Sequence, residues 1–154
     1  MPNKVSAVAR YIINCAERDG HPISNLKLQK VLYFLWKRYY WKTGAYLFED
    51  DHFFAWKFGP VIPSVYYEYF MFGAYPIASG LLDPFNEEEL SSDVRDFISE
   101  VVKEYENVSV AALIKQTHIP NGAWDRVFNN GKGIKEIIPY REIKEDILNE
   151  YRES

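Results

Sequence analysis

The fold of this chain is decided by ISNLKLQKVLYF at residues 23–34 and by AWKFGPVIP at residues 55–63. The first stretch opens with Ser24 and Asn25, both favourable helix N-caps, and continues into a run that is apolar on more than one side. In the second stretch the apolar residues alternate with a period of two, which is typical of a strand, until glycine and proline end it. Neither stretch contains a catalytic pattern, so the sequence favours a protein that acts by binding.

The first stretch predicts a long helix that runs to about Thr43 and is ended by Gly44, a residue suited to the left-handed conformation after a helix. One broad face carries Leu28, Leu32, Leu35, Trp36 and Tyr39. The opposite arc mixes basic and aromatic residues, namely Lys27, Lys30, Phe34, Lys37, Arg38 and Trp41. A helix with this much apolar surface is expected at the centre of the fold, with neighbours on more than one side.

The rest of the chain predicts a mainly α fold of about six to seven helices with a small β-hairpin near residues 46–58. The hairpin is read from YLF and FFAWKF, which flank the turn sequence EDDH at residues 49–52. Asn3 is a candidate N-cap for a first helix, and Ser91 and Ser109 are candidates for later ones. The absence of linkers and repeats in the 154 residues predicts a single domain over residues 1–154.

Composition and charge narrow the functional classes. The formal net charge of −4 offers no overall attraction to nucleic acid or to an anionic membrane. No run of eighteen apolar residues and no signal-peptide pattern occurs, which predicts a cytoplasmic protein without membrane partners. The single cysteine, Cys15, excludes an internal disulfide and a thiolate-rich metal site.

A search for reaction chemistry yields no catalytic residue, metal site or cofactor, so the chain is not predicted to be an enzyme. His21, His52 and His118 lack metal-binding spacing, and EDDH is expected to be a solvated loop. His118, in THIPNGAW, is expected to brace its loop by hydrogen bonding to the backbone and accepting from a donor. A small enzyme with a site at His118, Gln29 or Tyr66 stays an alternative, because catalytic groups can meet in space from distant positions.

The basic and aromatic arc of the long helix raises a second alternative, a nucleic-acid-binding module. Lysines could contact phosphates while Phe34 and Trp41 stack on bases. The negative net charge and the expected burial of those rings argue against this use. Nucleic acid is therefore not a predicted partner.

Several motifs together resemble the Panacea domain, the family of SocA-like antitoxins also described as phage-associated GepA-type proteins. They are VARYIIN, ISNLKLQKVLYF, LFEDDHFFAWKFGPVIPSVYYEY and a later TH…W, and they cover nearly the whole chain. The resemblance implies an antitoxin of a type II toxin–antitoxin system that neutralises a toxin encoded by an adjacent gene through direct protein contact. It also implies an alternative, because one member of the family acts as an adaptor that delivers its toxin to a AAA+ protease.

The family motifs and the helical arc together suggest where a toxin binds. Gln29 and Lys30 belong to the helix-start motif but are explained by neither capping nor packing, which marks them as candidates for a shared functional surface. We expect a face shared by the long helix and the hairpin exit to contact the toxin. The predicted contact residues are Lys27, Gln29, Lys30, Phe34, Lys37, Trp41, Trp56 and Tyr66.

Overall fold

The structure is a computed structural model that describes residues 2–152. Its α-helices are α1 (Val5–Arg18), α2 (Asn25–Thr43), α3 (Pro63–Glu68), α4 (Ser92–Tyr105), α5 (Val110–Thr117), α6 (Ala123–Phe128) and α7 (Tyr140–Arg152). Its strands are β1 (Phe53–Trp56), β2 (Gly59–Val61) and β3 (Ile137–Ile138), and short 3-10 turns are η1 (Phe70–Phe72), η2 (Ser79–Leu81), η3 (Glu87–Glu89) and η4 (Asn129–Gly131). The predicted mainly helical fold with a small sheet is confirmed. The predicted domain over residues 1–154 stays a prediction, and residues 1, 153 and 154 lie outside the described part.

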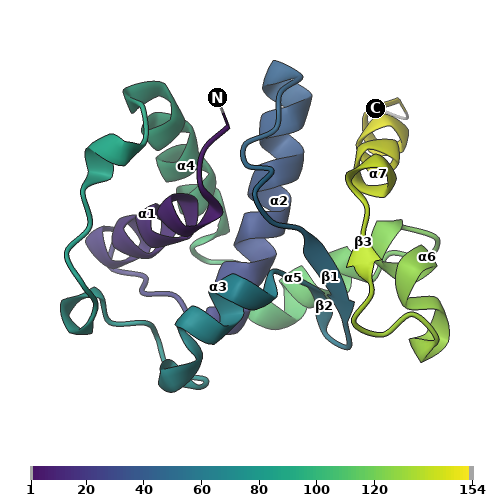
Figure 1. The fold of residues 1–154 in the computed structure, drawn as a ribbon, viewed down its shortest axis with the longest axis horizontal. Coiled ribbons are helices and arrows are strands. Elements are labelled where there is room, and N and C mark those ends of the chain that lie inside the picture. The colour runs from purple at the N-terminus through teal and green to yellow at the C-terminus, as the bar shows by residue number, and fades with distance from the viewer. Residues whose placement is uncertain (1, 153–154) are drawn as a thin grey trace.

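Helix α2 runs through the middle of the molecule (Figure 1). Helices α1 and α4 lie on one side of it, and the sheet, α6 and α7 lie on the other. It contacts α1, α3, α4, α5, α7 and β2, as expected from its wide apolar surface. Trp36 is fully buried at its centre, where the indole Nε1 donates to the Phe48 carbonyl at 3.1 Å and the ring stacks on Tyr140.

Local signals for helix ends were accurate for most helices. The Ser24 hydroxyl accepts from the Lys27 amide at 3.3 Å, and Gly44 adopts a left-handed conformation at the end of α2. Ser91 and Ser109 cap α4 and α5 in the same way. Because these contacts join residues within one helical turn, the sequence alone reveals them.

The predicted N-cap of α1 is wrong. Asn3 does not cap this helix, because its side chain donates to the Leu47 carbonyl at 2.9 Å. The carboxylate of Asp50 accepts from the Val5 amide instead, at 3.1 and 3.3 Å. The EDDH sequence, expected to be only a solvated loop, therefore supplies a cap from a residue far along the chain.

The sheet forms later in the chain than the sequence suggested. Strand order is β2-β1-β3, and β1 pairs antiparallel with both neighbours. Residues 46–48 form no strand of this sheet; Phe48 makes an isolated bridge with Asn3. Gly59 and Pro60, read as the end of a strand, belong to β2 and face Trp56 and Ala55. Proline is compatible with this position because β2 is an edge strand, where a missing amide donor is tolerated.

Within residues 2–152, none of the helices has both the length and the apolar character needed to cross a membrane.

Candidate partner-binding surface

A buried polar network fixes the exit of the hairpin against the start of α2. The Gln29 side chain accepts from the Ile62 amide at 3.0 Å and donates to Asn25 at 3.1 Å. Asn25 in turn donates to the Tyr66 carbonyl at 2.8 Å. Because each buried polar group in this chain of contacts has a partner, the backbone that joins β2 to α3 is held in one position.

Lys30 is fully buried beside the same hairpin. Its Nζ donates to the Pro60 carbonyl at 2.8 Å, and burial lowers the pKa of Lys30 to about 7. The φ of Gly59 is +114°, and a Cβ there would lie 3.0 Å from this Nζ and 2.7 Å from the Thr117 hydroxyl. Glycine is therefore required at this position by conformation and by space together.

His118 and Trp124 hold the other side of the hairpin. Their rings stack with centroids 3.8 Å apart and planes 5° apart, and the Trp124 Nε1 donates to the Trp56 carbonyl at 2.8 Å. His118 hydrogen-bonds to the backbone of Phe58, so the bracing contact expected of it is present. Its Nε2 is buried without a hydrogen-bond partner, so the expected second bond is missing. Burial, and then the charge of Lys30, lower the pKa of His118.

The reason for selecting Gln29 and Lys30 is wrong, because hydrogen bonds within the fold explain both side chains. The sequence placed them on a partner-binding surface because no local role explained them, whereas the structure buries both side chains completely. Their hydrogen bonds reach residues about thirty positions away, which a helical pattern does not reveal. Residues from the motifs that carry the family resemblance meet at the hairpin and hold it in place. We call the hairpin held in this way the platform.

That platform carries an open apolar groove of about 520 Å³ on its outer side. We call it the aromatic groove and define it by Leu26, Trp56, Phe58, Tyr66, Gly73, Ala74 and Ile134. It joins the start of α2 to the hairpin, α3 and the loop before β3. Phe58 is 55% exposed although it is large and apolar. Exposed apolar surface of this kind is typical of protein interaction sites.

Further aromatic residues extend the groove along α3 and η1. The rings of Trp56 and Tyr66 meet edge to face with centroids 5.1 Å apart, and Tyr66 contacts Phe70 at 5.9 Å. Tyr67 touches the same rings, and both Tyr67 and Phe70 are exposed. Because each ring rests on another, the side chains are held in place before any partner arrives, which lowers the entropic cost of binding.

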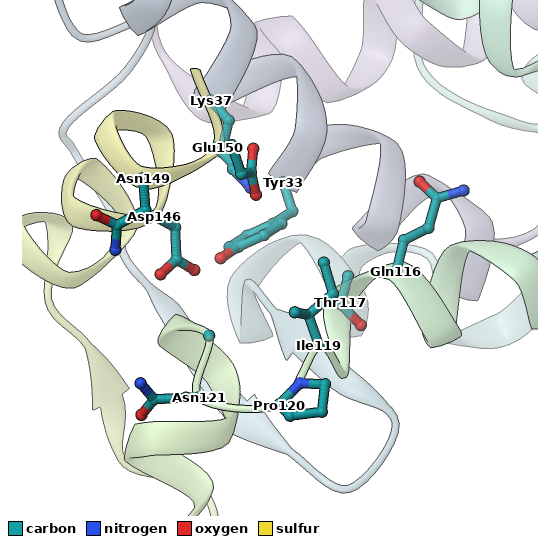
Figure 2. A pocket seen from close by; sticks show the side chains of 11 residues that line it. Tyr33, Lys37, Gln116, Thr117, Ile119, Pro120, Asn121, Asp146, Asn149 and Glu150 are labelled. Carbon is teal, nitrogen blue, oxygen red and sulfur yellow. The ribbon is translucent and has the colours of Figure 1, made fainter. Parts of the chain in front are cut away.

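A second, more polar depression of about 280 Å³ lies between α2, the α5–α6 connection and α7. Figure 2 shows the hydroxyl of Tyr33 pointing toward Asp146 across it. Lys37 lines it, but its Nζ is already paired with the Glu150 carboxylate at 2.6 Å. Burial raises the pKa of Tyr33 far above its ordinary value. Because Lys37 and Glu150, which line this depression, already pair with each other, the depression leaves fewer groups available to a partner than the aromatic groove does.

The predicted contact residues do not form one surface. Trp56 and Tyr66 line the aromatic groove, whereas Gln29 and Lys30 lie in the interior. The others lie elsewhere on α2: Phe34 is buried against Tyr105, Lys37 is paired with Glu150, Lys27 donates to the Glu106 carbonyl at 3.2 Å and Trp41 is 51% exposed. No contact with a toxin is tested for any of them, so the assignment stays a prediction.

Sequence reasoning missed Phe58, Tyr67 and Phe70 as surface residues. A signal was available, because YYEYF at residues 66–70 holds more rings than a short helix can bury on one face. In α3 and the residue after it, only Val65 and Tyr69 are buried. Ile134 and Lys135 gave no local signal, since only the pairing of β3 with β1 brings their loop to the groove.

The three residues considered for an enzyme site do not come together in the described part of the chain. Tyr66 lines the groove, Gln29 is interior and His118 is stacked on Trp124, so these three side chains do not converge on one open pocket. Across residues 2–152 no group of three or more His, Cys, Asp or Glu side chains is placed to hold a metal ion.

Comparison with known proteins gives two similarities. A family model described as "Antitoxin SocA-like, Panacea domain" matches residues 28–125, a range that contains most of α2, the hairpin and Trp124. The protein "Antitoxin SocA" of Caulobacter vibrioides (strain NA1000 / CB15N) is 35% identical over 139 residues, covering 82% of this chain and 71% of that protein. No solved structure matches the chain.

Proposed function

This chain belongs to the family of SocA-like antitoxins with a Panacea domain, and we propose that it is the antitoxin of a type II toxin–antitoxin pair that neutralises its toxin by direct protein–protein binding. The partner is a toxin encoded by an adjacent gene. The family assignment confirms the resemblance seen in the sequence motifs. The mode of neutralisation and the binding surface are the parts that we propose.

The observation that supports direct binding is the exposed aromatic groove on a rigid platform. Tryptophan and tyrosine dominate the binding energy of many protein interfaces, because they bury much area and lose little freedom. Here Trp56 and Tyr66 are held by ring contacts, and the hairpin beneath them is fixed by Gln29 and Lys30. A rigid apolar surface of this kind suits tight and lasting contact with a protein.

The first test is co-expression of the chain with the product of the adjacent reading frame. We expect growth to be restored and the two proteins to co-purify as a stoichiometric complex. Tyr67→Ser, which changes an exposed ring, should weaken both effects, whereas Leu81→Ser changes an apolar residue in η2 that is exposed at least as much and should leave them unchanged. Failure of the unchanged chain to restore growth or form a complex would refute the proposal.

A second measurement separates direct neutralisation from delivery to a AAA+ protease. Direct binding predicts that the toxin's half-life is the same or longer when the chain is present, because the toxin is held in a complex. Growth restored together with a shorter toxin half-life, and lost when the protease is deleted, would contradict direct neutralisation and support the adaptor alternative.

A further inference from the structure

Two lysines stand at the aromatic groove without a carboxylate beside them. The Lys57 Nζ lies 5.6 Å from the centre of the Phe58 ring, and the Lys135 Nζ lies 5.7 Å from that of Trp56. Within residues 2–152 neither lysine takes part in an ion pair, and no Asp or Glu lines the groove. Glu136 lines a separate depression beside α6. The groove is thus locally basic in a chain of net negative charge.

The backbone of Lys135 carries a second indication. Its φ is +64°, a left-handed conformation that is strained for a lysine, while its amide donates to the Ala55 carbonyl at 2.6 Å. The other non-glycine residues with positive φ in the described part of the chain are all asparagine, which tolerates this conformation. Glycine would suit this position better, so the strained lysine favours a role for its side chain over Trp56.

We propose that the aromatic groove binds a segment of the toxin in which an apolar or aromatic side chain is flanked by carboxylates. The apolar side chain packs against Trp56, Phe58 and Tyr66. The carboxylates pair with Lys57 and Lys135, whose ammonium groups lie beside the rings of Phe58 and Trp56. The inference rests on the proposed function and adds the chemistry of the segment that is bound.

The charge of the groove distinguishes this occupant from two others. A second copy of the chain would have to place its own carboxylates here, and a nucleic acid strand would bring phosphates toward a protein of net charge −4. A toxin segment needs only local complementarity to two cations. Oligonucleotide binding and the oligomeric state would reveal either rival occupant.

The test measures affinity for the purified product of the adjacent reading frame by titration calorimetry with the full chain. Charge reversal in the double variant Lys57→Glu/Lys135→Glu should weaken binding by about tenfold or more, because attraction becomes repulsion. Lys103→Glu, which reverses an exposed lysine on α4, should leave the affinity within about twofold. Raising NaCl from about 50 to 500 mM should weaken toxin binding by the unchanged chain and have less effect on binding by the double variant.

Two further variants separate binding from folding. Lys135→Gly relieves the backbone strain, so its melting temperature should be equal or higher while its affinity falls. Phe58→Ser removes an exposed ring and should weaken binding with little change in melting temperature, whereas Leu81→Ser should change neither. A purely structural role for Lys135 would leave the affinity of a stable Lys135→Gly protein unchanged.

The outcomes show whether the groove inference fails alone or together with the proposed function. If the unchanged chain binds and neutralises the toxin, but the charge-reversal variant and Phe58→Ser bind it with the same affinity, the groove inference is wrong and the proposed function stands. If the unchanged chain neither binds nor neutralises, both fall. Tight binding of fluorescent oligothymidine that is lost in the double variant, or a dimer that Phe58→Ser dissociates, would also overturn the inference.

Discussion

Lys30 is unusual because it is a fully buried lysine whose ammonium group donates to a neutral carbonyl, that of Pro60. A charged ammonium is poorly stabilised there, which is why its pKa falls from 10.5 to about 7. Near neutral pH the side chain loses its charge readily and still donates a hydrogen bond. Lys30 therefore acts as a structural tie between α2 and β2.

Stability should depend on pH through Lys30. As pH falls from about 10 to 7, the unfolded chain takes up a proton at this position and the folded chain does not, so the free energy of unfolding decreases. Each pKa unit is worth about 1.4 kcal/mol, which makes the decrease several kcal/mol. Below pH 7 both states are protonated at this residue and its effect is constant.

Urea unfolding at several pH values, with Lys30→Met as the comparison, measures this effect. The variant keeps a flexible apolar stem but cannot titrate, so the difference between the two proteins should change between pH 7 and 10. Lys103→Met should keep the pH dependence of the unchanged chain. Burial raises the pKa of Cys15 and Tyr69, which reduces stability at the alkaline end in all these proteins and cancels in the difference. Parallel curves for the unchanged chain and Lys30→Met would contradict the prediction.

Gly59 should tolerate no side chain. In Gly59→Ala the new Cβ would meet Thr117 and Lys30 at a backbone φ of +114°, so we expect a loss of about 2 kcal/mol or more. Gly80→Ala is the matched control, because nothing lies within 4 Å of its Cβ and its φ is not positive. Thermal unfolding followed by circular dichroism compares the two. Equal melting temperatures would show that the hairpin can shift to accept a methyl group.

At the scale of elements, helix α1 depends on a cap supplied from outside its own sequence. Asp50 lies in the segment between α2 and β1, and its carboxylate reaches the Val5 amide. In the same region Asn3 and Leu47 are joined by two hydrogen bonds. The start of the chain is thus attached to the segment that leads into the sheet.

Asp50→Ala should therefore destabilise a helix that begins forty-five residues earlier in the chain. We expect a loss of about 1 kcal/mol, which is typical when a helix loses its N-cap. Glu49→Ala removes the neighbouring exposed carboxylate, which does not cap α1, and should have little effect. Hydrogen exchange of the α1 amides locates the change, and unchanged exchange in Asp50→Ala would exclude the capping role.

At the scale of the molecule, the aromatic residues that form the core are not the ones that we propose for partner binding. Trp36 is fully buried against Tyr140 and Phe48, whereas the rings of the groove are partly or largely exposed. Both sets belong to the same 17% of aromatic residues and cannot be told apart by composition. The structure separates them by exposure.

Trp36→Ala should lower the free energy of unfolding by about 3–5 kcal/mol, since it removes a fully buried ring and leaves a cavity. Trp41→Ala, at a tryptophan that is half exposed on the same helix, should cost clearly less. Urea unfolding measures both. Similar losses for the two variants would contradict the assignment of Trp36 to the core.

The sequence by itself determined the features that depend on neighbours along the chain. Ser24, Ser91, Ser109 and Gly44 mark helix ends through contacts within one turn, and the apolar period of α2 predicts its central place. The motifs ISNLKLQKVLYF and AWKFGPVIP, in this order and at this spacing, indicated the family, which the comparison with known proteins confirms.

Only the tertiary structure decided which polar residues face inward and which rings face outward. Gln29 and Lys30 are buried because the hairpin exit brings backbone groups of Pro60 and Ile62 to them. The groove exists because α2, the hairpin, α3 and the loop before β3 meet at one place. Hydrogen bonds and packing between distant segments depend on how the elements assemble, and a local pattern carries no record of that assembly.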